Sequence, residues 1–142
     1  IKCDWSSDVC SSDLSNMHKE KLEIIASEVI GAAIEVHRIL GPGLLESTYE
    51  KCLCKELDLR KISYKRQEKL EVNYKGELIE EAYRLDIIVE DELILELKAV
   101  EELKEIHKYQ LLTYLKLSNK KLGLLINFNV SLLKNGIKRI IN

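Results

Sequence analysis

Two neighbouring stretches decide the fold of this chain: Tyr83-Arg-Leu-Asp-Ile-Ile-Val89 and Leu93-Ile-Leu-Glu-Leu-Lys98. Both are rich in β-branched and leucine side chains and alternate between apolar and charged positions, which predicts β-strands. Glu90-Asp91-Glu92 lies between them and predicts a tight turn. The two stretches should therefore pair as an antiparallel hairpin.

The alternation divides this hairpin into two faces. The face expected on the core carries Tyr83, Leu85, Ile87, Val89, Leu93, Leu95 and Leu97, and the other carries Arg84, Asp86, Ile88, Ile94, Glu96 and Lys98. A slip of one residue would flip every side chain of a strand, so like faces must pair. Asp86 can therefore face Glu96 or Ile94. Either pairing brings Asp86, Glu96 and Lys98 together.

The rest of the chain follows from changes in the hydrophobic period. Helices are predicted over residues 18–40, about 44–60 and 104–117, and strands over residues 62–73, 77–89, 93–99 and 122–128. Gly41-Pro-Gly43 ends the first helix, and Asn73-Tyr-Lys-Gly76 turns between the first two strands. Residues 130–142 should form a turn and a last short element. The order α-α-β-β-β-α-β predicts an α/β (α+β) domain with a mixed central sheet flanked by helices.

The composition is that of one ordinary globular domain. The chain has 142 residues, of which 46% are hydrophobic and 32% charged. No apolar run approaches the roughly 18 residues of a membrane-spanning helix, so no membrane partner is expected. The balance of 22 basic against 24 acidic residues excludes a uniformly basic surface for nucleic acid, although a local basic groove remains compatible with it.

The first 16 residues stand apart from the rest. Cys3-Asp-Trp-Ser-Ser-Asp-Val-Cys-Ser-Ser-Asp-Leu14 resembles a sequencing adapter translated in frame. We therefore expect residues 1–16 to be a non-native or disordered leader and residues 17–142 to be the domain. Cys52 and Cys54 are two apart on a predicted helix, so they point to different faces and cannot form half of a zinc site. A reduced cytoplasmic protein without a disulfide framework is the simplest expectation.

Two carboxylates and a lysine on neighbouring strands can be interpreted in two ways. Hard divalent cations such as Mg²⁺ bind carboxylate oxygens and waters, and a lysine beside them can stabilise charge on a phosphate. Alternatively, Asp86, Glu96 and Lys98 form cross-strand ion pairs on an exposed sheet face. On spacing alone the ion pairs are the simpler interpretation.

Three motifs in the sequence resemble those of a known family of proteins. Asp86 followed by Glu96-Leu-Lys98 resembles the signature of the PD-(D/E)XK nuclease superfamily, and Gln110-Leu-Leu-Thr-Tyr114 is similar to the Gln-x-x-x-Tyr element of its RecB-like members. Gly43-Leu-Leu-Glu46-Ser-Thr-Tyr49 matches the pattern that names the GxxExxY proteins, a family of small bacterial and archaeal members. The resemblance covers about Leu22 to Asn142 and implies a restriction-endonuclease-like core.

The resemblance also implies roles for the matching residues. Asp86, Glu96 and Glu46 would hold Mg²⁺ or Mn²⁺, and Lys98 would be the catalytic lysine. The residues that would support the site or contact the substrate are Gln110, Tyr114, Arg84 and Tyr49. Without the resemblance, Glu46 is a carboxylate favoured by the helix dipole, and the two tyrosines are typical core or rim aromatics.

The implied function is that of a metal-dependent nuclease that acts on nucleic acid, with DNA as the expected substrate. A non-catalytic module that binds nucleic acid or protein on the same fold is the first alternative, because fold does not imply function. A hydrolase of smaller phosphate esters is the second. A homodimer or a protein partner is compatible with the chain, and nothing in the sequence tests either.

Overall fold

The computed structural model describes residues 2–142, with the side chains of residues 15–80 and 83–142. In chain order the elements are α1 (Lys2–Leu40), α2 (Glu46–Leu59), β1 (Tyr64–Tyr74), β2 (Glu77–Val89), β3 (Leu93–Lys98), α3 (Glu105–Ser118), β4 (Leu122–Asn127), the 3₁₀ helix η1 (Leu133–Gly136) and β5 (Ile137–Ile141). Within this range five strands form one sheet in the order β1-β2-β3-β4-β5. Only β3 and β4 pair in parallel. The predicted mixed α+β architecture is confirmed.

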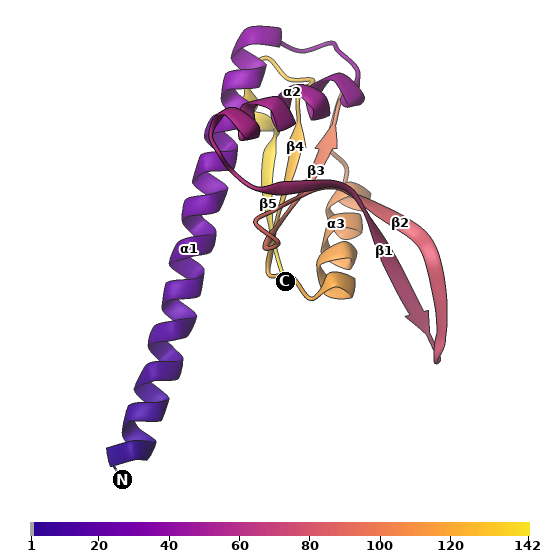
Figure 1. Cartoon of the computed structure of the whole chain (residues 1–142). Coiled ribbons are helices and arrows are strands. Elements are labelled where there is room, and N and C mark those ends of the chain that lie inside the picture. Colours follow the sequence, from indigo (N-terminus) through magenta and orange to yellow (C-terminus); the bar gives the residue numbers. More distant parts are fainter. Residues whose placement is uncertain (1) are drawn as a thin grey trace.

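The sheet lies between two helical layers. Helices α1 and α2 pack on one face and α3 on the other (Figure 1). The α1/α2 layer buries the alternate residues Ile87, Leu93, Leu95 and Leu97 of the central hairpin. On the opposite face, the intervening Ile88 and Ile94 pack against buried residues of α3. Both faces of the central strands are thus covered, which is usual for a sheet with a parallel pair.

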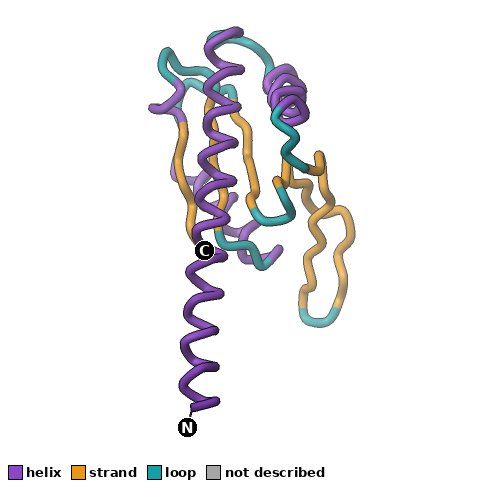
Figure 2. Tube along the Cα trace, turned by 60° about the vertical axis from the view of Figure 1, so that its left-hand side comes forward, coloured by secondary structure: helices purple, strands orange, loops and turns teal. Residues whose placement is uncertain are grey.

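Helix α1 is longer than predicted. It begins at Lys2 instead of near residue 18, and its N-terminal part extends beyond the sheet (Figure 2). The non-native origin of residues 1–16 stays a prediction, and the side chains of Cys3 and Cys10 lie outside the described residues. The helix ends as predicted: Gly41 follows it with a φ of +68°, and its N–H donates to the carbonyl of His37 at 2.8 Å. Glycine tolerates this left-handed conformation without strain.

The β1–β2 ribbon projects away from the rest of the sheet (Figure 1). The predicted turn is present, and Lys75 and Gly76 at its centre have φ angles of +52° and +87°, as a type I′ hairpin turn requires. Gln67, in the middle of β1, also has a left-handed φ, of +51°. A non-glycine residue in that conformation inside a strand changes the direction of the ribbon.

This change of direction overturns the predicted facing of two residues. Leu85 packs in the α3 layer, not with Ile87 in the α1/α2 layer, and Tyr83 is 47% exposed instead of buried. The strict alternation expected for β2 fails because the strand bends beside Gln67 and parts from β3 at Asp86. Both residues therefore face α3.

The C-terminal segment completes the sheet. Strand β5 pairs antiparallel with β4 and forms the outer edge, where a short unspecified element was expected. The turn before it is tight: a Cβ on Gly136 would lie 2.2 Å from the carbonyl oxygen of Asn127. The buried Asn127 side chain, in turn, accepts from the N–H of Val100 and donates to its carbonyl, at 3.0 and 2.8 Å. These bonds hold the segment that follows β3.

Candidate active site

The candidate site lies where β2 and β3 separate. Backbone pairing joins Val89 to Leu93, Ile88 to Ile94 and Ile87 to Leu95, and it stops there. The next pair would be Asp86 and Glu96, so the predicted register that brings these two carboxylates together is confirmed.

Beyond Ile87 and Leu95, hydrogen bonds between side chains and backbone amides connect β2 and β3 in place of backbone–backbone bonds. The N–H of Leu97 donates to Oδ2 of Asp86 at 2.9 Å, and the N–H of Asp86 makes a long contact of 3.4 Å with Oε1 of Glu96. Each carboxylate thus satisfies an amide of the opposite strand. The result is two adjacent acidic side chains, of which Glu96 is only 6% exposed.

Burial and the charges of neighbouring carboxylates shift both carboxyl groups toward the protonated form. Burial raises the pKa of Asp86, as do the charges of Glu50 and Glu46, while the Leu97 N–H and Lys98 oppose the shift. Burial also raises the pKa of Glu96, to about 8, with the charge of Asp86 as the second cause. Both carboxyl groups are therefore easier to protonate than free ones, and a cation beside them would offset their charge.

Lys98 and Glu46 lie beside the two carboxylates. We call the group of Asp86, Glu96, Lys98 and Glu46 the acidic corner. Lys98 is the last residue of β3 and follows Glu96 by two positions, so both side chains leave the same face of the strand. Its charge lowers the pKa of both Asp86 and Glu96. Glu46 is the exposed first residue of α2 and lines, with Asp86, a cavity of about 220 Å³. The structure therefore brings all four predicted catalytic residues to one corner of the fold.

The donor set suits a cation held by two carboxylates. Among the described side chains, no three of the types His, Cys, Asp and Glu are arranged to hold a metal ion. Mg²⁺, however, needs only one or two carboxylates beside waters and substrate phosphate. Asp86 and Glu96, neighbours across the hairpin, supply two carboxylates and so fit this requirement.

Sequence reasoning missed a network on the floor of the same cavity. Glu50 is 8% exposed, and its carboxylate accepts from the Arg66 guanidinium and from the Gln67 amide, both at 2.7 Å. Gln67 is the residue whose left-handed backbone bends β1. One signal was available: Glu50 comes four residues after Glu46, on the same face of α2. Its partners on β1 were not visible in the sequence.

The predicted supporting residues divide into two groups. Gln110 donates its amide to the Tyr114 hydroxyl at 2.9 Å. Burial raises the pKa of Tyr114, and the charge of Glu96 is the second cause, so this pair lies beside the carboxylates. Arg84 is exposed on β2, two residues before Asp86.

Tyr49 is placed differently. It is fully buried and stacks on Phe128, with ring centroids 4.4 Å apart. Its hydroxyl donates to the carbonyl of Gly41 at 2.5 Å and accepts from the N–H of Leu44 at 3.1 Å. Tyr49 therefore supports the loop that leads into α2 and Glu46, and it is not at the surface where a substrate would be met.

The pKa of Glu96 leads to a testable dependence of stability on pH. The folded-state pKa of Glu96 lies above its ordinary value of 4.5, so the folded state is favoured when Glu96 is protonated. This contribution to the free energy of unfolding is complete below about pH 4.5 and is lost as the pH rises to about 8. In chelator, the free energy of unfolding of wild type should fall relative to Glu96→Gln over this range, by up to about 1.4 kcal/mol per pH unit. Chemical denaturation at several pH values measures it. Exposed Glu101→Gln is the control, and parallel curves for wild type and Glu96→Gln would refute the assignment.

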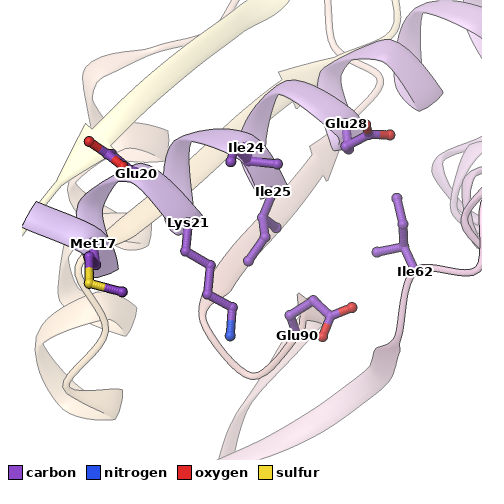
Figure 3. Close-up of a pocket in the computed structure, with 8 residues that line it drawn as sticks. All are labelled: Met17, Glu20, Lys21, Ile24, Ile25, Glu28, Ile62 and Glu90. Atoms are coloured by element: carbon purple, nitrogen blue, oxygen red, sulfur yellow. The ribbon is translucent and has the colours of Figure 1, made fainter. Parts of the chain in front are cut away.

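A further cavity lies away from the predicted site residues. It measures about 480 Å³ and lies along α1, where Ile24, Ile25 and Ile62 form an apolar floor rimmed by charged side chains such as Lys21 and Glu90 (Figure 3). Its lining includes none of the residues predicted for the site. The acidic corner remains the best candidate site.

Comparison with known proteins gives one result. A sequence model of the PD-(D/E)XK nuclease superfamily matches residues 23–140. Neither the curated proteins nor the solved structures contain a match to the chain. No helix among the described residues has the length and apolar character needed to cross a bilayer.

Proposed function

The chain belongs to the PD-(D/E)XK nuclease superfamily, and from this membership we propose that it is a metal-dependent nuclease that hydrolyses phosphodiester bonds, preferentially in DNA. Within the superfamily we assign it to the RecB-like GxxExxY proteins. That assignment rests on the Gly43–Tyr49 motif and on Gln110 and Tyr114, whose side chains are hydrogen-bonded.

The contact between Asp86 and Glu96 is the observation that carries the proposal. A cross-strand ion pair would need opposite charges across the hairpin, and here two acidic residues occupy these positions. Glu96 is buried, its Oε1 lies 3.4 Å from the N–H of Asp86, and the Asp86 carboxylate accepts from the N–H of Leu97. Like charges so placed destabilise a fold. A bound divalent cation would offset this repulsion. Metal binding therefore explains why two acidic residues occupy these positions, whereas the stability of the fold does not.

The roles of the residues follow from their positions. Asp86 and Glu96 would hold Mg²⁺ or Mn²⁺, with Glu46 across the cavity completing the acidic site. The bound cation would supply an activated water and offset charge on the scissile phosphate. Lys98 then orients the attacking water and stabilises negative charge that develops on the phosphate. Arg84, exposed on β2, is suited to bind a neighbouring phosphate.

Asp86→Asn tests the proposal. The asparagine oxygen can still accept from the Leu97 N–H, so the fold should be retained while one ligand charge is lost. We expect cleavage of single- and double-stranded DNA in Mg²⁺ or Mn²⁺ to fall at least about 100-fold. Mn²⁺ affinity, measured by calorimetry, should fall at least about 10-fold.

Wild type in chelator and the exposed-site variant Glu101→Gln are the controls. Cleavage that survives in Asp86→Asn would point to a contaminant and contradict the site. Folded wild type that binds no metal and cuts neither DNA nor RNA would favour the non-catalytic binding module. Metal binding with hydrolysis of small phosphate diesters alone would favour the smaller substrate class.

A further inference from the structure

Tyr83 is the exposed aromatic residue nearest to the candidate site along β2. Its side chain is 47% exposed, and its ring centroid lies 5.6 Å from that of Tyr114 at an interplanar angle of 48°. Its cross-strand partner is Leu70, which is 7% exposed. The ring thus has one side fixed against the protein and the other open to solvent.

The partner ring is itself held in place. Tyr114 is 6% exposed, accepts a hydrogen bond from Gln110 and lies close enough to Glu96 to be affected by its charge. Tyr83 also precedes Asp86 by three residues on the same strand, which corresponds to about 10 Å. The exposed ring therefore packs against a buried ring and lies close to the carboxylates.

We propose that Tyr83 stacks on an unpaired base of the nucleic acid bound at Asp86 and Glu96, so that the protein acts on single-stranded or locally unpaired substrate. The inference rests on the proposed nuclease function and names its substrate class. Aromatic side chains stack on bases of any sequence, but only where the face of the base is accessible. In a duplex each base face is covered by its neighbours. A ring already ordered by Tyr114 loses little freedom when it stacks.

The position of Tyr83 supports this use over a purely structural one. An exposed aromatic residue is ordinary on any surface, and Tyr74, 60% exposed near the tip of the same ribbon, is such a residue. Tyr74 has no aromatic neighbour among the described side chains, only Lys75 over its ring. The two tyrosines therefore form a matched pair that differs in distance from the site.

Binding of DNA to the full chain carrying Lys98→Ala tests the inference without cleavage. The probes are a single strand of about 15 nucleotides, with 2-aminopurine as one base, and the corresponding duplex. Tyr83→Ala should weaken single-strand binding about 5- to 100-fold and change duplex binding less than about twofold. Tyr83→Trp should retain the affinity and the quenching of 2-aminopurine, and Tyr74→Ala should leave both unchanged.

The outcomes separate this inference from the function on which it rests. If neither Lys98→Ala nor wild type in chelator binds either probe, the proposed nuclease function fails and the stacking proposal fails with it. If it binds DNA but Tyr83→Ala weakens single strand and duplex equally, or neither, the nuclease function stands and the stacking proposal is wrong. Unchanged thermal unfolding of Tyr83→Ala confirms that a loss of binding is not a loss of fold.

Discussion

The Lys98→Ala variant should cleave nucleic acid about 10²- to 10³-fold more slowly than wild type, at unchanged thermal stability. The loss is what removal of one preorganised charge-stabilising group costs in a water-poor site. Stability should be retained because Asp86 and Glu96, whose carboxylates Lys98 favours, can take up a proton when its charge is removed. Single-turnover cleavage with saturating Mg²⁺ measures the effect.

The comparison with metal binding makes this prediction specific. Lys98→Ala should still bind Mn²⁺ with at least wild-type affinity, since a positive charge beside the carboxylates has been removed. Lys121→Ala is the matched control, because Lys121 is exposed and precedes the end of β4 that is farther from Lys98. A Lys98→Ala enzyme within threefold of the wild-type rate would remove Lys98 from the mechanism.

The second large effect concerns stability. Tyr49→Ala should lower the free energy of unfolding by about 3–5 kcal/mol, the usual cost of deleting a fully buried aromatic side chain. Tyr49→Phe keeps the stacking on Phe128 but leaves the Gly41 carbonyl and the Leu44 N–H without their partner, for about 1–3 kcal/mol. Chemical denaturation of both variants measures these values.

Exposed Tyr74→Ala is the control and should change the free energy of unfolding by less than about 0.5 kcal/mol. A cost below about 1 kcal/mol for Tyr49→Ala would mean that the loop before α2 does not depend on this residue. The loop would then need another explanation for how it presents Glu46.

The core hairpin could be predicted because its determinants are local. Alternation predicts the two strands, and the requirement that like faces pair limits Asp86 to two partners. The observed register, continued by one pair, aligns Asp86 with Glu96. The Lys75-Gly76 turn was visible for the same reason, since a glycine beside a polar residue marks a tight hairpin turn. Where local pattern and burial agreed, element bounds were within a few residues.

The errors arose where a distant contact decides the local structure. Tyr83 and Leu85 follow the alternation of a core face, yet the left-handed Gln67 on the neighbouring strand turns them toward α3. Gln67 adopts that backbone where its amide meets Glu50 of α2, a contact across 17 positions of the sequence. Strand β5 is similar: Ile137-Lys-Arg-Ile-Ile141 is too short to identify without the edge of β4 beside it.

The two turns that join β1, β2 and β3 should differ in how well they tolerate inserted residues. One residue inserted in the turn between Val89 and Leu93 has to be absorbed within that turn. If β3 shifted by one residue instead, Glu96 and Lys98 would face the α1/α2 layer and Leu97 would turn out, so that packing and chemistry would be lost together. At the Lys75-Gly76 tip the ribbon is exposed, and added residues would displace neither layer. Natural variants and grafted peptides should therefore be accepted at the tip and eliminated at the inner turn.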